Sequence, residues 1–232
     1  MSSLPTIYTA RSDVDPAHLA RVEDWYAHRH APDLIQAGFY TAQVYYSELG
    51  APRICNLYEI PGPALFLTEA YRDVAAKDVE GPEVIALLTS RSNTIYEQVL
   101  TVKVPAGGGD WTAGQRTGAV TAPAISTVRF DAPEAAAPVL LDWYRAEEFP
   151  RLQGRPGFRT GRLCRRGPPH PVAASRDPRW FAINEWDSVA AALADGTARD
   201  ATARLATALP GRVSSVLYNV GRRHFRLARS GA

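Results

Sequence analysis

Hydrophobic and polar positions along the chain predict the same series of elements twice. Runs of β-forming residues predict four strands in each half. In the first half these strands cover residues 6–11, 39–47, 53–60 and 96–104. In the second half they cover residues 125–130, 158–166, 179–186 and 214–220. The correspondence between the two sets indicates two units with one architecture.

Helices are predicted in the intervals between these strands. The first helix of each half should begin at a cap that contains proline, near Asp15 in one half and Pro133 in the other. It should end near Pro32 or Pro150, because the residue before a proline avoids the helical conformation. Alanine-rich helices follow over residues 63–77 and 188–207, and residues 81–92 predict a further short helix. Each half therefore predicts the order β-α-β-β-α-β of a ferredoxin-like unit.

The two halves also match in sequence, as an internal repeat would. Asp24-Trp25-Tyr26 corresponds to Asp142-Trp143-Tyr144, and Gly38-Phe39 corresponds to Gly157-Phe158. A glycine-rich stretch lies between the halves and has the composition of a flexible linker. We therefore expect an N-terminal unit at residues 1–105, a linker at residues 106–120 and a C-terminal unit at residues 121–232.

The composition is that of a globular protein. Of the 232 residues, 46% are hydrophobic and 22% are charged. No apolar run approaches the roughly 18 residues that a membrane span needs, and no signal-peptide pattern opens the sequence. The two cysteines, Cys55 and Cys164, are too few for a disulfide framework, and we expect both in the core. These features predict a cytoplasmic protein that does not associate with membranes.

The charge differs between the two halves. Residues 1–115 carry 8 basic and 14 acidic side chains, whereas residues 116–232 carry 18 basic and 10 acidic ones. Either the halves attract each other, which we favour, or the second half presents a surface that binds anions. A short basic cluster near the C-terminus is typical of a solvated tail: Arg222, Arg223, His224, Arg226 and Arg229. We expect no nucleic-acid partner.

The first helix carries a motif of a known family. The run Trp25-Tyr26-Ala27-His28-Arg29-His30-Ala31-Pro32-Asp33, followed by Gly38-Phe39, resembles the EthD-like branch of the dimeric α/β-barrel superfamily. The resemblance implies an α+β fold in which two ferredoxin-like units pack sheet to sheet as a barrel. Two chains usually supply the units, but here a tandem duplication in one chain would supply both. The superfamily includes monooxygenases, polyketide cyclases, haem enzymes and lyases, so it does not fix the function.

His30 is the leading candidate for chemistry. At about 100° per residue, Leu19, Val22, Tyr26 and His30 share one helix face, and His28 points away from it. A neutral imidazole on that face can take a proton from a substrate. The resemblance implies a catalytic or ligand-binding histidine at this kind of position. The alternative is a structural histidine that caps its helix or hydrogen-bonds a buried carbonyl.

Two neighbours complete the predicted catalytic set. Tyr26 shares the face of His30 and is the best candidate for an acid or hydrogen-bond donor. Asp33 follows three residues after His30 and would orient its ring. The catalytic candidates are therefore His30, Tyr26 and Asp33.

Glu148 takes the place of His30 in the second half. It shares a helix face with Leu140 and Tyr144. A carboxylate on an apolar stripe needs a raised pKa or an arginine partner, for which Arg129 and Arg179 are candidates. Because the histidine is lost, we do not expect two equivalent sites. The second cleft either binds something different or has become structural, and we favour the structural interpretation.

Five side chains are candidates for binding the substrate: Asn56, Tyr58, Tyr46, Trp25 and Glu148. Alternation along residues 53–60 places Asn56 and Tyr58 on one face of a strand that is buried on both sides. These two side chains would either face the ligand or satisfy each other inside the barrel. Packing is the alternative role for Trp25.

These residues predict a cofactor-free enzyme that uses acid–base chemistry on a small apolar or aromatic carbonyl compound. His30 would take the proton, and Tyr26 or Asn56 would stabilise the oxyanion. The reaction would be that of a cyclase, dehydratase, isomerase or lyase of the EthD or polyketide-cyclase type. The alternatives are a cofactor-independent monooxygenase, a haem protein with His30 as axial ligand, and a non-catalytic protein that binds a hydrophobic metabolite. No metal-binding spacing occurs, and a homodimer is the further assembly we consider.

Overall fold

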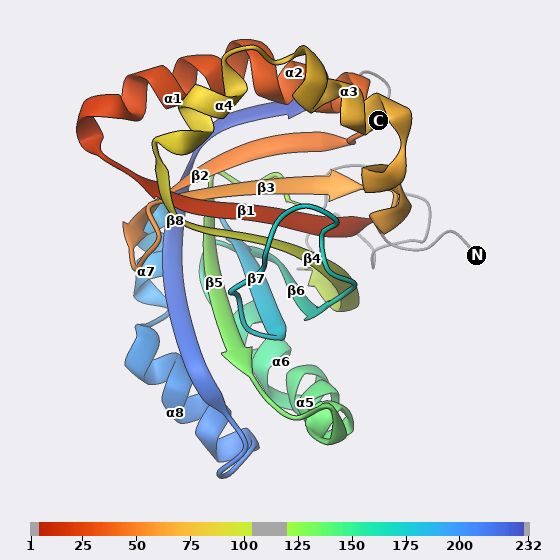
Figure 1. Ribbon diagram of the computed structural model, residues 1–232. Coiled ribbons are helices and arrows are strands. Elements are labelled where there is room, and N and C mark those ends of the chain that lie inside the picture. Colours follow the sequence, from red (N-terminus) through yellow and green to blue (C-terminus); the bar gives the residue numbers. More distant parts are fainter. Residues whose placement is uncertain (1–4, 104–119, 230–232) are drawn as a thin grey trace.

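The strands of the protein form one closed antiparallel barrel (Figure 1). A computed structural model describes residues 5–103 and 120–229, so the predicted linker lies almost wholly outside the described residues. The strands follow one another around the barrel in the order β1-β3-β2-β8-β5-β7-β6-β4. Their bounds are β1 Thr6–Val14, β2 Thr41–Leu49, β3 Ile54–Ile60, β4 Leu88–Lys103, β5 Ala124–Asp131, β6 Phe158–Arg166, β7 Trp180–Trp186 and β8 Ser214–Ala228. The predicted α+β barrel of two ferredoxin-like units is confirmed.

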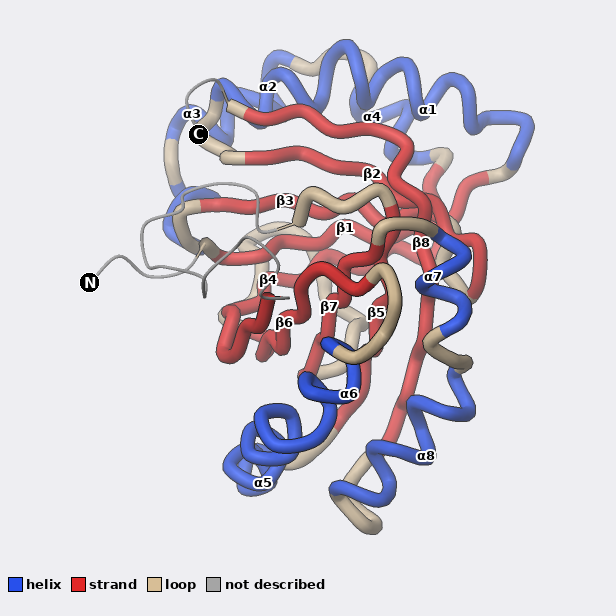
Figure 2. The backbone as a smooth tube through the Cα atoms, turned by 180° about the vertical axis from the view of Figure 1, so that it is seen from behind, coloured by secondary structure: helices blue, strands red, loops and turns tan. Residues whose placement is uncertain are grey.

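Helices cover the outer face of each half of the barrel (Figures 1 and 2). In the first half they are α1 Leu19–Trp25, α2 Ala31–Gln36, α3 Glu69–Lys77 and α4 Gly81–Ala86. In the second half they are α5 Ala137–Trp143, α6 Phe149–Gln153, α7 Val189–Ala194 and α8 Ala198–Ala208. The predicted helix over residues 188–207 is thus divided in two, and Gly196 at the division has a φ of 141° that side chains rarely adopt. The capping box of Thr197 and Asp200 then starts α8.

The fourth strand of each half continues into the other half. Strand β4 pairs first with β1 and then, from Tyr96 onward, with β6. Strand β8 pairs first with β5 and then with β2. The predicted strands at 96–104 and 214–220 were therefore too short, and the predicted helix over 81–92 ends at Ala86. The basic cluster is largely exposed, as predicted, but four of its five residues lie within β8 and not in a tail, and Arg222 pairs with Glu48.

The first helix of each half does not end at its proline. A π-helical turn, Tyr26–His30, joins α1 to α2, and the N–H of Ala31 donates to the carbonyl of Tyr26, five residues earlier. The same turn occurs at Tyr144–Glu148 in the second half. The wider turn accommodates a following proline, which has no N–H of its own to donate within the helix. The helix therefore continues past Pro32, and the predicted end is wrong.

Apolar side chains fill both the barrel and the layers outside it. Ile7, Tyr45 and Leu57 belong to the cluster inside the barrel. Ile54 and Tyr58, on the opposite face of β3, pack against the helices of the first half. Strand β3 is therefore buried on both faces, as its alternation predicts. Cys55 and Cys164 are buried free thiols, which confirms their predicted place in the core.

One carboxylate pairs with arginines from both halves. Arg11 and Arg129, at corresponding positions of β1 and β5, both form ion pairs with Asp177, at 3.4 Å and 2.6 Å. Burial alone would raise the pKa of Asp177, but the two guanidinium groups hold it below its ordinary value. Arg11 also lies over the ring of Phe181, 4.8 Å from its centroid. Asp177 therefore stabilises the contact between the halves.

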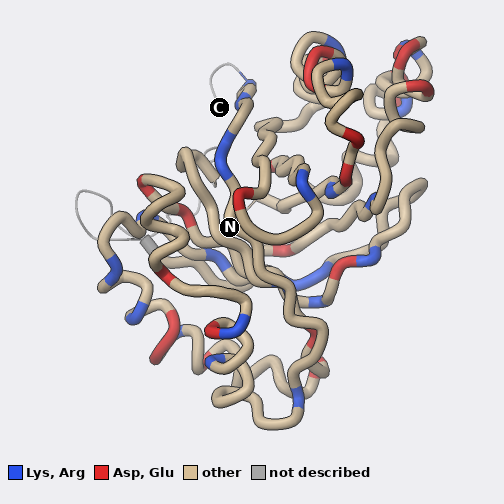
Figure 3. The backbone as a smooth tube through the Cα atoms, turned by 90° about the vertical axis from the view of Figure 1, so that its left-hand side faces the viewer, with Lys and Arg blue, Asp and Glu red and all other residues tan. Residues whose placement is uncertain are grey.

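Charged residues of both signs are interspersed along the helices and strands (Figure 3). No helix in the described part of the chain is long and apolar enough to span a bilayer.

Candidate functional site

A large cavity lies between the helices and the sheet of the first half. Its volume is about 520 Å³, and its polar surface is small beside its apolar surface. The sheet contributes residues of β1, β3 and β4, and the helical layer contributes residues of α1 to α4 and the turns between them. A mostly apolar cavity of this size with a few polar groups is typical of a binding site for a small organic molecule.

The second half closes the cavity with a loop. Residues 170–173 line the cavity. They lie between β6 and β7, and so belong to the second half of the chain. The loop is tied to β4 by hydrogen bonds: the N–H of Asn93 donates to the carbonyl of Ala174 at 3.1 Å, and that of Arg176 donates to Ser92 at 2.8 Å. Figure 1 shows this teal loop reaching up to the strands of the first half. The site is therefore built by both halves.

His30 lies in this cavity against Trp25. The two rings are stacked, with 4.5 Å between centroids and 21° between planes. The indole N–H of Trp25 donates to the carboxylate of Asp78 at 2.8 Å, and Asp78 also accepts the backbone N–H of Gly81. Trp25, His30 and Asp78 all line the cavity. The tryptophan therefore holds both the imidazole and a carboxylate in place.

The environment of His30 keeps its ring neutral. Burial lowers the pKa of His30 to about 4, although the charge of Asp78 acts to raise it. Its Nδ1 is buried and makes no hydrogen bond with any described residue. The sequence left open a structural role in which His30 hydrogen-bonds a buried carbonyl. Its Nδ1 makes no such bond with any described residue. The Oδ1 of Asn56, on the sheet side of the same cavity, is a second buried polar atom without a partner among the described residues.

Two tyrosine hydroxyls in the cavity each receive a hydrogen bond from the protein. The side-chain amide of Asn93 donates to the hydroxyl of Tyr8. The N–H of Val172 donates to Nδ1 of His170, so the proton of this imidazole lies on Nε2, which donates to the hydroxyl of Tyr71 at 3.2 Å. Burial lowers the pKa of His170, which favours this neutral form. Both tyrosines thus keep their own protons free to donate into the cavity.

The aromatic rings around these hydroxyls form a continuous stack. Tyr8 lies between Tyr58 and His170, with ring centroids 5.3 Å and 5.4 Å away and planes inclined by 23° and 20°. Phe66 meets Tyr8 edge-on at 4.9 Å. Burial raises the pKa of Tyr8 well above its ordinary value and that of Tyr71 to about 12. Both hydroxyls are therefore protonated at neutral pH.

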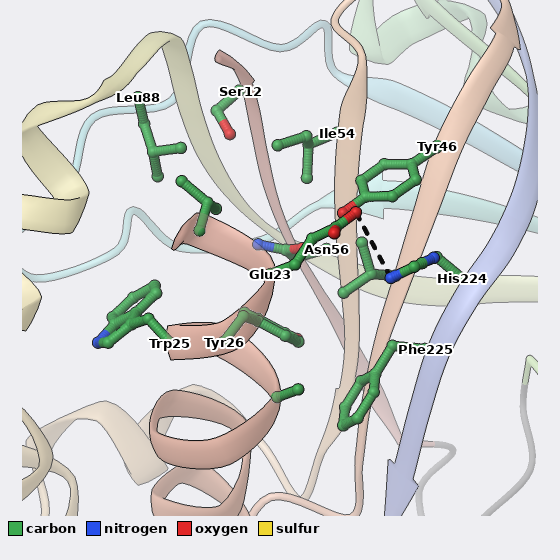
Figure 4. A pocket seen from close by; sticks show the side chains of 13 residues that line it. Ser12, Glu23, Trp25, Tyr26, Tyr46, Ile54, Asn56, Leu88, His224 and Phe225 are labelled. Atoms are coloured by element: carbon green, nitrogen blue, oxygen red, sulfur yellow. Dashed lines mark ion pairs between the residues drawn. The ribbon is translucent and has the colours of Figure 1, made fainter. Parts of the chain in front are cut away.

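A narrow slot adjoins the cavity on the other side of α1 (Figure 4). Its volume is only about 40 Å³, and it shares Trp25 and Asn56 with the cavity. His224, from β8 of the second half, contacts the ring of Tyr46 at a tilt of 33° and lies 3.5 Å from the carboxylate of Glu23. The slot is too small for an aromatic ligand, so the larger cavity is the candidate site.

The structure brings together four of the predicted site residues: His30, Trp25, Asn56 and Tyr58. Tyr26 and Tyr46 line the adjoining slot instead, and the ring of Tyr26 lies 6.5 Å from that of Tyr58. Asp33 lies outside the cavity and pairs with Arg29 at 3.1 Å. His28 is exposed and pairs with Asp24, as the helix face predicts.

Glu148 lies in the other half, away from the cavity. It forms ion pairs with Arg151 at 2.8 Å and Arg204 at 3.3 Å. The predicted partners were therefore wrong, because Arg129 pairs with Asp177 and Arg179 pairs with Glu134. Glu148 corresponds to His30 in the repeat, so the second half has a partly buried ion-pair network where the first half has the histidine of its cavity.

Sequence reasoning missed four residues that shape the site: Tyr8, Tyr71, Asp78 and His170. Alternation along β1 could have selected Tyr8, and helical spacing along α3 could have selected Tyr71, whereas Asp78 follows the end of α3. Nothing in the local sequence indicates that His170 reaches the other half. Among the described residues, no group of three or more side chains is arranged to hold a metal ion.

Solved structures identify the class of fold. No protein-family model matches the sequence, and no curated protein does. The chain is similar to an anthrone oxidase-like protein at a TM-score of 0.61 and 14% identity, over 97% of this chain and 93% of that one. It is similar to a proposed monooxygenase from Lactobacillus acidophilus at 0.57 and 11%, over 97% of both chains. A haem-binding protein from Thermus thermophilus matches at 0.52 and 10%, over 96% and 92%. These neighbours place the chain in the fold class of the dimeric α/β barrels.

Proposed function

We propose that the protein is an enzyme that removes a proton from a small aromatic carbonyl compound bound in the cavity. The observation that carries the proposal is the neutral imidazole of His30, which lines an aromatic cavity and whose Nδ1 has no partner among the described residues. A pKa of about 4 keeps this imidazole unprotonated at neutral pH, and a negative charge that forms beside it in the cavity raises its affinity for a proton. The substrate needs a C–H bond next to a carbonyl group, since that is the proton a neutral imidazole can take.

In the proposed step the C–H proton moves to Nε2 of His30, and the electron pair of that bond moves onto the carbonyl oxygen. The resulting enolate oxygen accepts hydrogen bonds from the hydroxyls of Tyr8 and Tyr71, whose lone pairs already accept from Asn93 and His170. The charge of the enolate and the carboxylate of Asp78 both stabilise the imidazolium that forms. This assignment replaces Tyr26 as the proposed oxyanion donor, because Tyr26 lines the slot.

Anthrone tests the proposal, because it is a three-ring aromatic ketone with acidic methylene protons. In D₂O without dioxygen, the protein should speed the exchange of these protons for deuterium, as followed by NMR. His30→Gln should lower the catalysed exchange rate by about 10² or more. His28→Gln is the matched control, since that histidine is exposed and lies outside the cavity.

Three results would contradict the proposal in whole or in part. Exchange at the wild-type rate in His30→Gln would remove His30 as the base. Binding of anthrone without any acceleration of exchange would favour the non-catalytic binding protein instead. A Soret band in the freshly purified protein would contradict the cofactor-free form of the proposal and favour haem.

A cofactor-independent monooxygenase is the second candidate. The likeness to an anthrone oxidase-like protein and to proposed monooxygenases favours it. The same enolate would react with dioxygen: the methylene carbon is oxidised to a carbonyl, and dioxygen supplies that oxygen atom and is reduced to one water. Uptake of one dioxygen per anthrone, with anthraquinone as product, would distinguish this reaction from a cyclase, lyase or isomerase.

Three finer assignments complete the proposal. We place the chain in the EthD-like branch, on the residues around His30, and derive its halves from a tandem duplication. The corresponding ion pairs and π turns of the two halves support the duplication. A homodimer stays a prediction that analytical ultracentrifugation would test.

A further inference from the structure

We propose that the substrate carries a carboxylate, which Arg72 and Arg91 bind at the rim of the cavity. The proposal rests on the proposed function, because it concerns the same cavity. It adds a substrate class, namely an aromatic carbonyl compound with one acidic group.

Arg72 and Arg91 are the cationic side chains of the cavity that lack an internal counter-ion. Both line it and both are exposed, Arg72 on α3 and Arg91 on β4. Within residues 5–103 and 120–229, neither takes part in an ion pair. Arg21 and Arg29, on the same helical layer but outside the cavity, pair with Glu83 and Asp33.

A β-bulge directs Arg91 toward the cavity. The register between β1 and β4 shifts between Arg11 and Asp13, and Ser90 in this bulge has a φ of 52°. Beyond the bulge, Asn93 lines the cavity whereas Ser92 is buried on the barrel side, so odd-numbered residues face the helices. Arg91 shares the side of Asn93.

The second half repeats the bulge without the arginine. The register between β5 and β8 shifts at the corresponding place, and Ser215 has a φ of 54°. The residue that follows is Val216, in the position that corresponds to Arg91. The guanidinium is therefore specific to the half with the cavity, and the bulge itself does not require it.

The remaining charges of the cavity offset this positive charge only in part, because Asp78 is its one carboxylate among the described residues. Arg11, which also lines it, pairs with Asp177. The carboxylate that lines the cavity, Asp78, already accepts hydrogen bonds from Trp25 and Gly81. The charge of Arg91 acts inside the cavity. Burial raises the pKa of Tyr8, and the positive charge of Arg91 opposes part of that rise. Two free guanidinium groups beside an apolar cavity fit a ligand with an aromatic body and a carboxylate, which accepts paired hydrogen bonds from arginine.

A pair of two-ring probes tests this inference. 2-Naphthoate and 2-naphthamide share their ring system and differ in charge. Isothermal titration calorimetry should show that the wild-type protein binds naphthoate about tenfold or more tightly than naphthamide. Arg72→Gln and Arg91→Gln should each weaken naphthoate binding by about fivefold to tenfold and change naphthamide binding by less than about twofold.

Arg199→Gln is the matched control. It removes the same charge from an exposed arginine of α8 that lies outside the cavity, and naphthoate should bind to it as to the wild type. Equal affinity of the wild type for both probes would overturn the carboxylate assignment and leave the cavity as a binding site. If Arg199→Gln weakened naphthoate binding as much as Arg72→Gln and Arg91→Gln do, the net charge of the protein would explain the effect. That result would also overturn the carboxylate assignment. Absence of binding by both probes would count against this inference and the proposed function together.

Discussion

The indole of Trp25 and the imidazole of His30 lie almost parallel, 4.5 Å apart between ring centroids. The indole shields one face of the imidazole from water, and its N–H binds the carboxylate of Asp78. The π turn that begins after Trp25 brings His30 onto the same side of the helix although the two are five residues apart. This contact therefore sets both the position of the proposed base and its protonation.

Replacement of Trp25 should raise the pKa of His30. Burial is the main cause of the lowered value, about 4, so Trp25→Leu should admit water and move the pKa up by about one unit toward 6.5. NMR titration of the imidazole would measure the shift. Trp143→Leu, the corresponding change in the second half, should leave the pKa of His30 where it is.

The neutral form of His30 should make the fold sensitive to acid. Its folded pKa, about 4, lies below the ordinary value of 6.5, so between these pH values the unfolded chain binds a proton that the folded chain does not. The free energy of unfolding should therefore fall as the pH is lowered through this window, by up to about 3 kcal/mol from this group.

Urea denaturation of the wild type and of His30→Gln would measure that contribution. The variant should lose less stability than the wild type between pH 7 and about pH 4. His28→Gln should lose as much as the wild type, because His28 is exposed. Identical pH dependence in the wild type and His30→Gln would contradict the assignment.

Tyr71 should act in the proposed reaction with His170 as its positioning residue. Tyr71→Phe removes a donor to the enolate and should lower the anthrone exchange rate by about 10². His170→Gln should lower it less, because the hydroxyl remains but loses its fixed orientation. In the double variant the loss should equal that of Tyr71→Phe alone, since His170 acts through the tyrosine. Additive losses would show that His170 has a separate role.

Neutralisation of the buried carboxylate of Asp177 should destabilise the fold strongly. Asp177→Asn leaves Arg11 and Arg129 close together without a counter-charge and should destabilise the fold by about 3–5 kcal/mol. Urea denaturation would measure the loss. Asp142→Asn removes an exposed ion pair with Arg145 and should cost no more than about 1 kcal/mol. A loss of similar size in both variants would contradict the role of Asp177.

The elements of the fold were largely predictable because their signals are local. Alternation located β2, β3, β6 and β7 to within a residue or two, and repetition along the chain gave the two units. The continuation of β4 and β8 into the opposite sheets was not predictable, since it depends on partners 57 to 187 residues away. The π turns were missed because proline usually ends a helix, and a widened turn before it leaves no sequence signal of its own.

The candidate site was predictable only where one helix or one strand carries it. Helical spacing placed His30 on the buried face, and strand alternation placed Asn56 beside Tyr58. Tyr26 was predicted to share the cavity with His30 but lines the adjoining slot. The π turn between the two residues changes their relative direction around the helix. Asp78 and His170 come from a turn and a loop, where no periodicity indicates which neighbour a side chain meets.

The loop that carries His170 allows the substrate range to change during evolution without a change at His30. It forms a wall of the cavity, yet it belongs to the half that does not contain His30. Insertions or deletions in surface loops are tolerated far better than changes in strands or helices. A change of length between β6 and β7 would resize the cavity and leave the helix of the proposed base untouched. The base and the selectivity for its substrate are thus separately adjustable parts, each supplied by a different half.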